Sequence, residues 1–236
     1  MATNQECKCA RTCRRCGSFF AHSFRFRILS LLAALCVALP QLTRAQQVDN
    51  PAKKLVESEL VLEGGGSVGH YSVVAYSQAR EVYTTGLEYD RHSWGSFLGA
   101  RLDYVAELLP AVFLTEPARY DSAGIALTTD RKVTFGTGIS ATGVRLLWRR
   151  DKTFKPFLIA KGGIVYFTNR VISTEGGHLN FSSQFGTGLE TRLSPHWDLR
   201  TGFTYFHLSD GNLAPKNPGV DFMYFAGGVG YRFGGR

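Results

Sequence analysis

Apolar and polar side chains alternate along several stretches of this chain. Between residues 179 and 193, apolar side chains take most odd positions, and polar side chains or glycines take the even ones. Segment 97–108 repeats the pattern, with Leu102 opposed by Asp103. Because successive side chains of a β-strand point to opposite faces, each stretch predicts a strand with one apolar and one polar face.

Eight segments are predicted as strands in this way. They cover residues 68–77, 82–91, 97–108, 139–149, 157–167, 179–193, 197–208 and 220–233. Each has about the length, roughly ten residues, that a tilted strand needs to cross a bilayer. Long connections are expected over residues 110–138 and between the last two strands. The glycines at 64–66 are expected to form a flexible stretch before the first strand.

Two architectures place charges on one strand face and apolar residues on the other. A soluble sandwich turns the apolar face inward, whereas a membrane barrel has a polar lumen and an apolar exterior. Aromatic residues near strand ends favour the membrane, as interface girdles do; they are Tyr89, Trp148, Phe167, Trp197 and Tyr231. The predicted fold is all-β, an eight-stranded antiparallel transmembrane β-barrel of the outer membrane.

The N-terminal region has the features of a secretory signal peptide. Arg25 and Arg27 precede an apolar core over 28–39, and small residues at 43–45 offer a cleavage site. We therefore divide the chain into a signal peptide (1–45), a periplasmic lead-in (46–66) and the barrel (67–236). All five cysteines lie within 1–45, so disulfides cannot stabilise the mature chain.

The net charge of +8 suggests a basic protein, but much of it belongs to the predicted signal peptide. Residues 1–45 hold seven lysines and arginines and one glutamate, which leaves 20 basic and 18 acidic residues in the rest. Such a balanced chain offers no basic surface for a nucleic acid, so nucleic acid is excluded as a partner.

Three reactive side chains interrupt the apolar faces of the last two strands. His207 and Ser209 share the face of the apolar odd positions in the seventh strand, and Asp221 begins the apolar face of the eighth. With eight strands, both ends of the barrel lie on the periplasmic side, so the link between these two strands is extracellular. The three groups are therefore expected at the outer rim, facing lipid.

The segment from His207 to Asp221 resembles the active-site segment of the lipid A 3-O-deacylase (PagL) family and related bacterial acyloxyacyl hydrolases. The family pattern is His-x-Ser-Asn, a loop asparagine, and a carboxylate at the start of the last strand. His207 and Ser209 match it, Asn217 matches the loop asparagine, and Asp221 stands in place of the usual glutamate. Asp210 replaces the asparagine after the serine.

Ester hydrolysis needs a nucleophile, a base and a group that orients the base. Ser209, His207 and Asp221 can fill these roles, although strand geometry separates the first two by roughly 7 Å. By resemblance, Asn217 stabilises the oxyanion, helped by backbone N–H groups around Asp210 and Gly211. An ionised Asp210 side chain cannot donate. No metal or cofactor is implied.

The expected function is that of an outer-membrane serine esterase that removes an ester-linked acyl chain, by resemblance the 3-O chain, from lipid A of lipopolysaccharide. The alternative is a non-catalytic eight-stranded surface or adhesion protein that binds through its long loops. An acyltransferase would need an acyl pocket in the lumen, and the charged inner faces argue against one. The sequence leaves open whether the barrel forms a homodimer.

Overall fold

The computed structural model describes residues 56–67, 72–77, 80–92, 94–216 and 218–234. The predicted signal peptide and residues 46–55 of the predicted lead-in lie outside this part of the chain. Within it, no helix has the length and hydropathy needed to span a bilayer.

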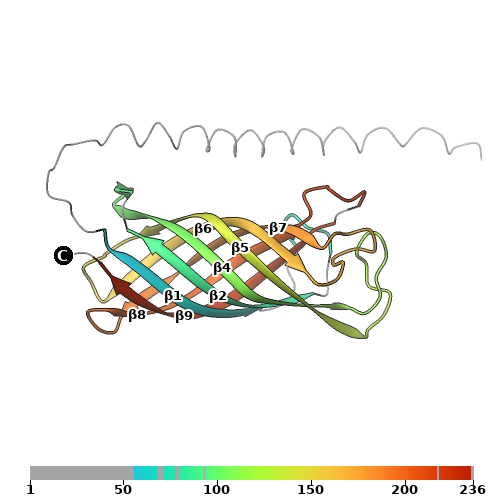
Figure 1. Cartoon of the computed structure of the whole chain (residues 1–236), viewed down its shortest axis with the longest axis horizontal. Coiled ribbons are helices and arrows are strands. Elements are labelled where there is room, and N and C mark those ends of the chain that lie inside the picture. The colour runs from blue at the N-terminus through green and yellow to red at the C-terminus, as the bar shows by residue number, and fades with distance from the viewer. Residues whose placement is uncertain (1–55, 68–71, 78–79, 93, 217, 235–236) are drawn as a thin grey trace, which may run out of the picture. The chain divides into compact units, whose positions relative to one another are not determined.

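The strands form one closed antiparallel sheet (Figure 1). They are β1 (Ser58–Ser67), β2 (Glu81–Arg91), β3 (Ser96–Phe97), β4 (Ala100–Pro117), β5 (Arg131–Leu147), β6 (Phe154–Phe167), β7 (Leu179–Arg192), β8 (Trp197–Ser209) and β9 (Val220–Phe233). The long strands pair with their neighbours in the chain, and β1 also pairs with β9. β2 pairs with β4, because the two-residue β3 only pairs with the start of β4. The eight long strands confirm the predicted barrel.

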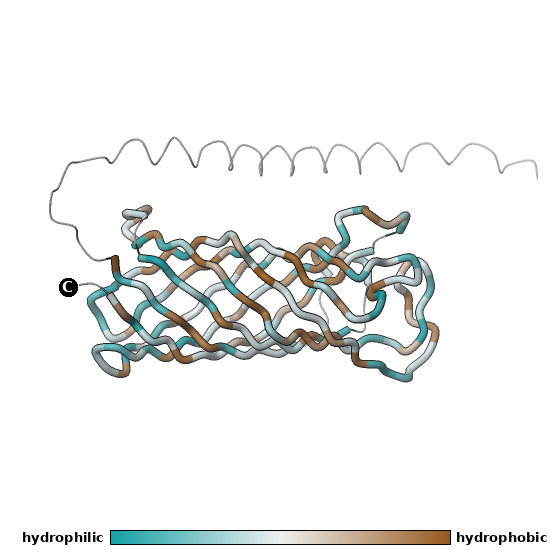
Figure 2. The backbone as a smooth tube through the Cα atoms, viewed as in Figure 1, coloured by the Kyte–Doolittle hydropathy of each residue, from teal (hydrophilic) through white to brown (hydrophobic). Residues whose placement is uncertain are grey.

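The outer and inner faces of the wall have opposite chemistry. Along β7, Phe181, Phe185 and Leu189 are exposed, whereas Asn180 and Glu190 are buried. Figure 2 shows the same mixture of hydrophobic and hydrophilic positions along the other strands. Since the apolar side chains point away from the lumen, the barrel has the polarity of a membrane protein.

The first strand was predicted wrongly. β1 is Ser58–Ser67, which includes the last nine residues of the expected lead-in, and no strand covers 72–77, the described part of the predicted one. The glycines that suggested flexibility lie inside β1, where neighbouring rings pack over them. A Cβ atom on Gly65 would lie 2.6 Å from the Tyr224 ring, and one on Gly66 would lie 2.7 Å from the Tyr83 ring. These positions need glycine because the aromatic rings occupy the space of a side chain.

The predicted long connection over 110–138 is also wrong in extent. β4 continues to Pro117 and β5 begins at Arg131, so the connection covers only 118–130. The pairing between the two strands is irregular between Leu109 and Val112. This bulge interrupts the alternation of side chains in the middle of β4. A prediction that requires strict alternation therefore ends the strand too early.

The lumen is filled in two layers. At the end where β1 begins and β9 ends, it holds a network of buried ion pairs, in which Arg145 contacts Asp90, Asp103 and Glu190 at 2.9 to 3.1 Å. Toward the opposite end it holds an apolar cluster that includes Leu114, Phe167, Phe206 and Phe222. The longer connections between strands gather at this second end, opposite the C-terminus (Figure 1).

Candidate active site

His207 and Asp221 are directly opposite each other on β8 and β9, at the end of the barrel that carries the long connections. Their side chains meet on the outward face, with His207 Nδ1 2.7 Å from Asp221 Oδ1. A carboxylate can only accept, so the imidazole donates from Nδ1. The other ring nitrogen, Nε2, is then left with a lone pair that can accept a proton.

The Asp221 carboxylate is completely buried although it points outward. Its Oδ1 atom also accepts a hydrogen bond from the Tyr205 hydroxyl at 2.7 Å. Its Oδ2 atom accepts three successive backbone N–H groups, from Val73 and Val74 at 2.7 Å and from Ala75 at 2.9 Å. Consecutive N–H groups of this kind form an anion-binding nest. The five donors compensate for the removal of the charge from water.

Ser209 follows His207 by two residues and shares its outward face, where it is partly exposed. Among the described residues, no hydrogen bond joins the Ser209 hydroxyl to the imidazole. The structure thus brings His207, the predicted base, into contact with Asp221, the carboxylate predicted to orient it. Ser209, the predicted nucleophile, lies on the same face two residues further along β8. In free enzymes the contact between nucleophile and base is often long and shortens when substrate binds.

Asp210 and Gly211 shape the turn after β8. The buried Asp210 carboxylate accepts the backbone N–H groups of Asn212 at 2.9 Å and Ala214 at 3.2 Å. Gly211 and Asn212 have positive φ angles of 68° and 65°. Asp210 therefore organises the loop, which is an ordinary role for aspartate at a turn. Asn217 lies outside the described residues.

Two contributors to the site were not predicted from the sequence. Tyr205 shares the odd positions of β8 with His207, so the alternation already placed the two side chains on one face. The donors Val73, Val74 and Ala75 precede Asp221 by 146 to 148 residues. No local pattern predicts a contact across that separation.

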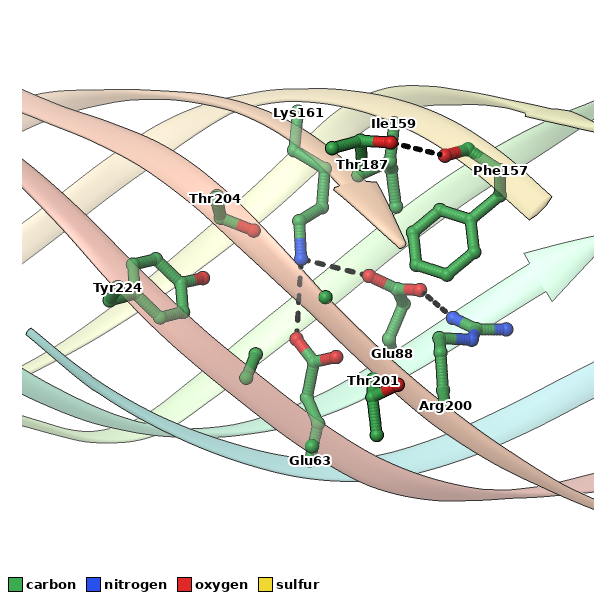
Figure 3. Close-up of a pocket in the computed structure, with 13 residues that line it drawn as sticks. Glu63, Glu88, Phe157, Ile159, Lys161, Thr187, Arg200, Thr201, Thr204 and Tyr224 are labelled. Carbon is green, nitrogen blue, oxygen red and sulfur yellow. Dashed lines mark hydrogen bonds and ion pairs between the residues drawn. The ribbon is translucent and has the colours of Figure 1, made fainter. Parts of the chain in front are cut away.

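An apolar groove of about 450 Å³ runs along the outer wall and reaches the site at Tyr205. Outward side chains of β5 to β9 line it, among them Leu146, Leu158, Phe185, Phe203 and Met223. In the described part of the lumen, the cavity lined by Glu63, Glu88, Lys161 and Arg200 measures only about 30 Å³ (Figure 3), and a pocket of about 280 Å³ at Glu57, Arg101 and Lys155 is lined mainly by charged side chains. A long apolar chain therefore fits the exterior of the barrel.

Three carboxylates in that part of the lumen, Glu63, Glu88 and Glu107, are spaced as metal ligands could be. The Lys161 ammonium lies among them, 3.4 Å from Glu63 and 2.8 Å from each of the others. Figure 3 shows this lysine directed at Glu63 and Glu88. The ammonium group takes the position that a cation would need, so this cluster is an internal ion network.

A family model described as lipid A 3-O-deacylase (PagL) matches residues 82–232. The solved structure of the outer membrane enzyme PagL is 16% identical, covers 75% of this chain and 98% of that one, and has a TM-score of 0.45. For Neisserial surface protein A the values are 13%, 76%, 96% and 0.39. For OprG from Pseudomonas aeruginosa they are 11%, 78%, 99% and 0.45. No curated protein sequence matches the chain.

Proposed function

Because the chain belongs to the lipid A 3-O-deacylase (PagL) family, we propose that it is an outer-membrane serine esterase that removes the 3-O-linked acyl chain from lipid A. The observation that carries this proposal is the hydrogen-bonded pair of His207 and Asp221 on the apolar outer wall, with Ser209 beside it. This location supports a substrate that is itself part of the lipid layer.

In the proposed reaction, the Ser209 Oγ attacks the ester carbonyl carbon and passes its proton to His207 Nε2. Asp221 stabilises the imidazolium that forms. When the tetrahedral intermediate collapses, the bond to the sugar oxygen breaks and His207 returns the proton to that oxygen. Water then attacks the acyl-serine, with His207 again accepting a proton, and releases the fatty acid and free Ser209.

The negative charge on the carbonyl oxygen needs hydrogen-bond donors. We assign this role to the Asn217 side-chain amide and to the backbone N–H of Gly211. The Asp210 carboxylate is not a donor, because it accepts hydrogen bonds from the turn. The outer groove between Tyr205 and Leu158 is the proposed location of the acyl chain during the reaction.

The apolar outer wall and the family membership support a location in the outer membrane, reached after removal of a signal peptide over residues 1–45. Both chain ends of the barrel would lie in the periplasm and the site near the extracellular surface. Lipopolysaccharide is then the substrate and surrounding lipid the other partner.

Mass spectrometry of lipid A tests the function. Gram-negative cells would express the wild type, Ser209→Ala, or Thr85→Ala, which changes an outward hydroxyl on β2 far along the wall from the site. We expect the wild type and Thr85→Ala to remove one acyl chain, and fragmentation to assign it to position 3. Ser209→Ala should leave lipid A intact. Equal deacylation by wild type and Ser209→Ala would overturn the proposal, and intact lipid A in all three would favour the non-catalytic surface protein.

A further inference from the structure

The segment Ser72–Ser77, which we call the strap, lies across the start of β9. β1 ends where Ser67 pairs with Tyr224, so the first residues of β9 extend beyond their β1 partner. The strap lies along this edge of β9 and forms backbone contacts with it. The Tyr76 N–H donates to the Pro218 carbonyl at 2.9 Å, and Ser77 forms a parallel bridge with Val220.

The strap has two chemically different sides. On its inner side, three successive N–H groups hold Asp221 Oδ2, and Ala75 is buried. On its outer side, Val73, Val74 and Tyr76 are 72%, 61% and 78% exposed. Three adjacent apolar side chains with so much exposed surface are unusual unless something covers them.

The position of these side chains indicates what covers them. Asp221 belongs to the same outward parity of β9 as the exposed Phe225, so the strap lies on the face that carries the apolar band of the barrel. That face is in contact with acyl chains in a membrane barrel. An apolar strap side chain at this place therefore meets lipid.

We propose that the strap is a lipid-contacting positioning segment: Val73, Val74 and Tyr76 contact acyl chains of the outer-leaflet glycolipid, and the backbone of Val73 to Ala75 holds Asp221 in place for His207. The proposal rests on the proposed function. With Oδ2 fixed by the strap, the second oxygen is directed at the imidazole. Lipid contact on the outer side keeps the strap against β9, so the catalytic pair is completed where substrate is present.

Fluorescence quenching tests the lipid contact without any measurement of activity. Tyr76→Trp and the control Ile125→Trp, at a 62% exposed position in the connection 118–130, would be placed in vesicles with acyl chains brominated near the glycerol. The unsubstituted protein gives the background of Trp94, Trp148 and Trp197. We expect the added signal to be quenched strongly at position 76 and weakly at 125. Equal quenching at both positions would overturn the lipid contact.

Proline substitution tests the positioning role. Val74→Pro removes the N–H that donates to Asp221, while the conservative variant Val74→Ile keeps the N–H and an apolar side chain. We expect kcat on lipid A to fall about tenfold or more in Val74→Pro, the range for losing a hydrogen bond to a charged group, and to be retained in Val74→Ile. KM should change little in Val74→Pro. The folded barrel is checked by its heat-dependent mobility in electrophoresis.

Unchanged kcat in folded Val74→Pro would overturn the positioning role. If that variant does not fold, Val73→Pro removes the neighbouring donor and the same comparison applies with Val73→Ile. The two proposals fail in different ways. Full activity of Ser209→Ala refutes the esterase mechanism, whereas equal quenching at 76 and 125 with an inactive Ser209→Ala refutes the strap alone.

Discussion

At the scale of single residues, the Asp221 carboxylate defines the site, because all of its partners come from outside its own strand. Aspartate is one methylene shorter than the glutamate of the family pattern, so its charge stays close to the wall. The strap and the Tyr205 hydroxyl approach it there. The shorter side chain is compatible with the proposed triad because these donors reach it at the wall.

The first prediction concerns the Tyr205 hydroxyl. Tyr205→Phe removes one of the five hydrogen bonds to Asp221 and leaves the ring in the groove. We expect kcat to fall about ten- to 150-fold, since a hydrogen bond to a charged group contributes about 1.5–3 kcal/mol. Lipid A turnover in detergent micelles measures it. Tyr166→Phe, at an exposed outward position of β6, should match the wild type. Equal rates for Tyr205→Phe and Tyr166→Phe would contradict this role.

The second prediction separates the two roles considered for Asp210. Its carboxylate accepts from Asn212 and Ala214, so Asp210→Asn retains one acceptor for the turn. If the side chain serves only the turn, kcat should change by less than about threefold, that is, under 1 kcal/mol. A large increase in kcat would instead mean that the negative charge opposes the oxyanion, and that the asparagine of the family pattern acts as a donor.

The third prediction concerns the backbone under the imidazole. Gly219 has a φ of 61°, and a Cβ atom there would lie 3.1 Å from His207 Cε1. Gly219→Ala should lower the free energy of unfolding by about 1 kcal/mol. It should also displace the imidazole, so that the rise in activation free energy calculated from kcat exceeds the loss in free energy of unfolding. Gly227→Ala is the matched control, because its Cβ would meet only a carbonyl oxygen at 3.9 Å. Parallel losses in both variants would contradict a specific effect on His207.

At the scale of strands, the sequence predicts what depends on local alternation. β7, β8 and β9 were located closely because their polar and apolar positions alternate nearly without interruption, and the pair of His207 and Asp221 followed from that parity. β1 was missed because its glycines accept rings from β2 and β9, a feature of the neighbours and not of the segment. The strap was missed for the same reason, because its N–H groups donate to Asp221, which is distant in the sequence.

A fourth prediction belongs to the end of the barrel where β1 begins. The contact of Glu57 with His92, at 3.3 Å, lowers the pKa of Glu57 from 4.5 to about 2. Burial disfavours the charged form of His92, but its contacts with Glu57 and Glu59 outweigh burial and raise its pKa above 6.5. The stabilisation from Glu57 is therefore lost as pH falls below about 4.5, and that from His92 as pH rises above its raised pKa.

Urea unfolding in lipid vesicles at pH 5.5 and pH 9 measures this effect. The wild type should lose up to about 1 kcal/mol more free energy of unfolding than His92→Gln between these conditions, because Glu57 is partly exposed and the pair is screened. The backbone hydrogen bond from His92 to Glu57 remains in the variant, so the comparison isolates the side chain. An identical pH dependence of the two proteins would refute the assignment.

At the scale of the whole molecule, side chains fill the lumen of the barrel, and the candidate site lies on its outer face. The apolar cluster fills one end of the lumen and the ion network fills the other. The cavity of about 30 Å³ at Lys161 holds only one or two waters and is too small for an acyl chain. Beneath the candidate site the inner side of the wall is packed by the apolar cluster, which includes Phe206 of β8 and Phe222 of β9.

The last prediction tests whether the ion network maintains the barrel. Lys161 pairs with three carboxylates, Glu63 of β1, Glu88 of β2 and Glu107 of β4, and its side chain is only 4% exposed. Figure 3 shows its contacts with Glu63 and Glu88, and Glu88 also pairs with Arg200. Lys161→Met leaves these charges buried without that partner, so the free energy of unfolding should fall by about 3–5 kcal/mol. Lys152→Met, in the exposed turn before β6, should have no such effect. Adding Glu107→Gln to Lys161→Met should recover part of the lost free energy of unfolding, because fewer buried carboxylates are then without Lys161 as a partner. If Lys161→Met and Lys152→Met unfold at the same urea concentration, the lumenal charges do not stabilise the wall on which the site is built.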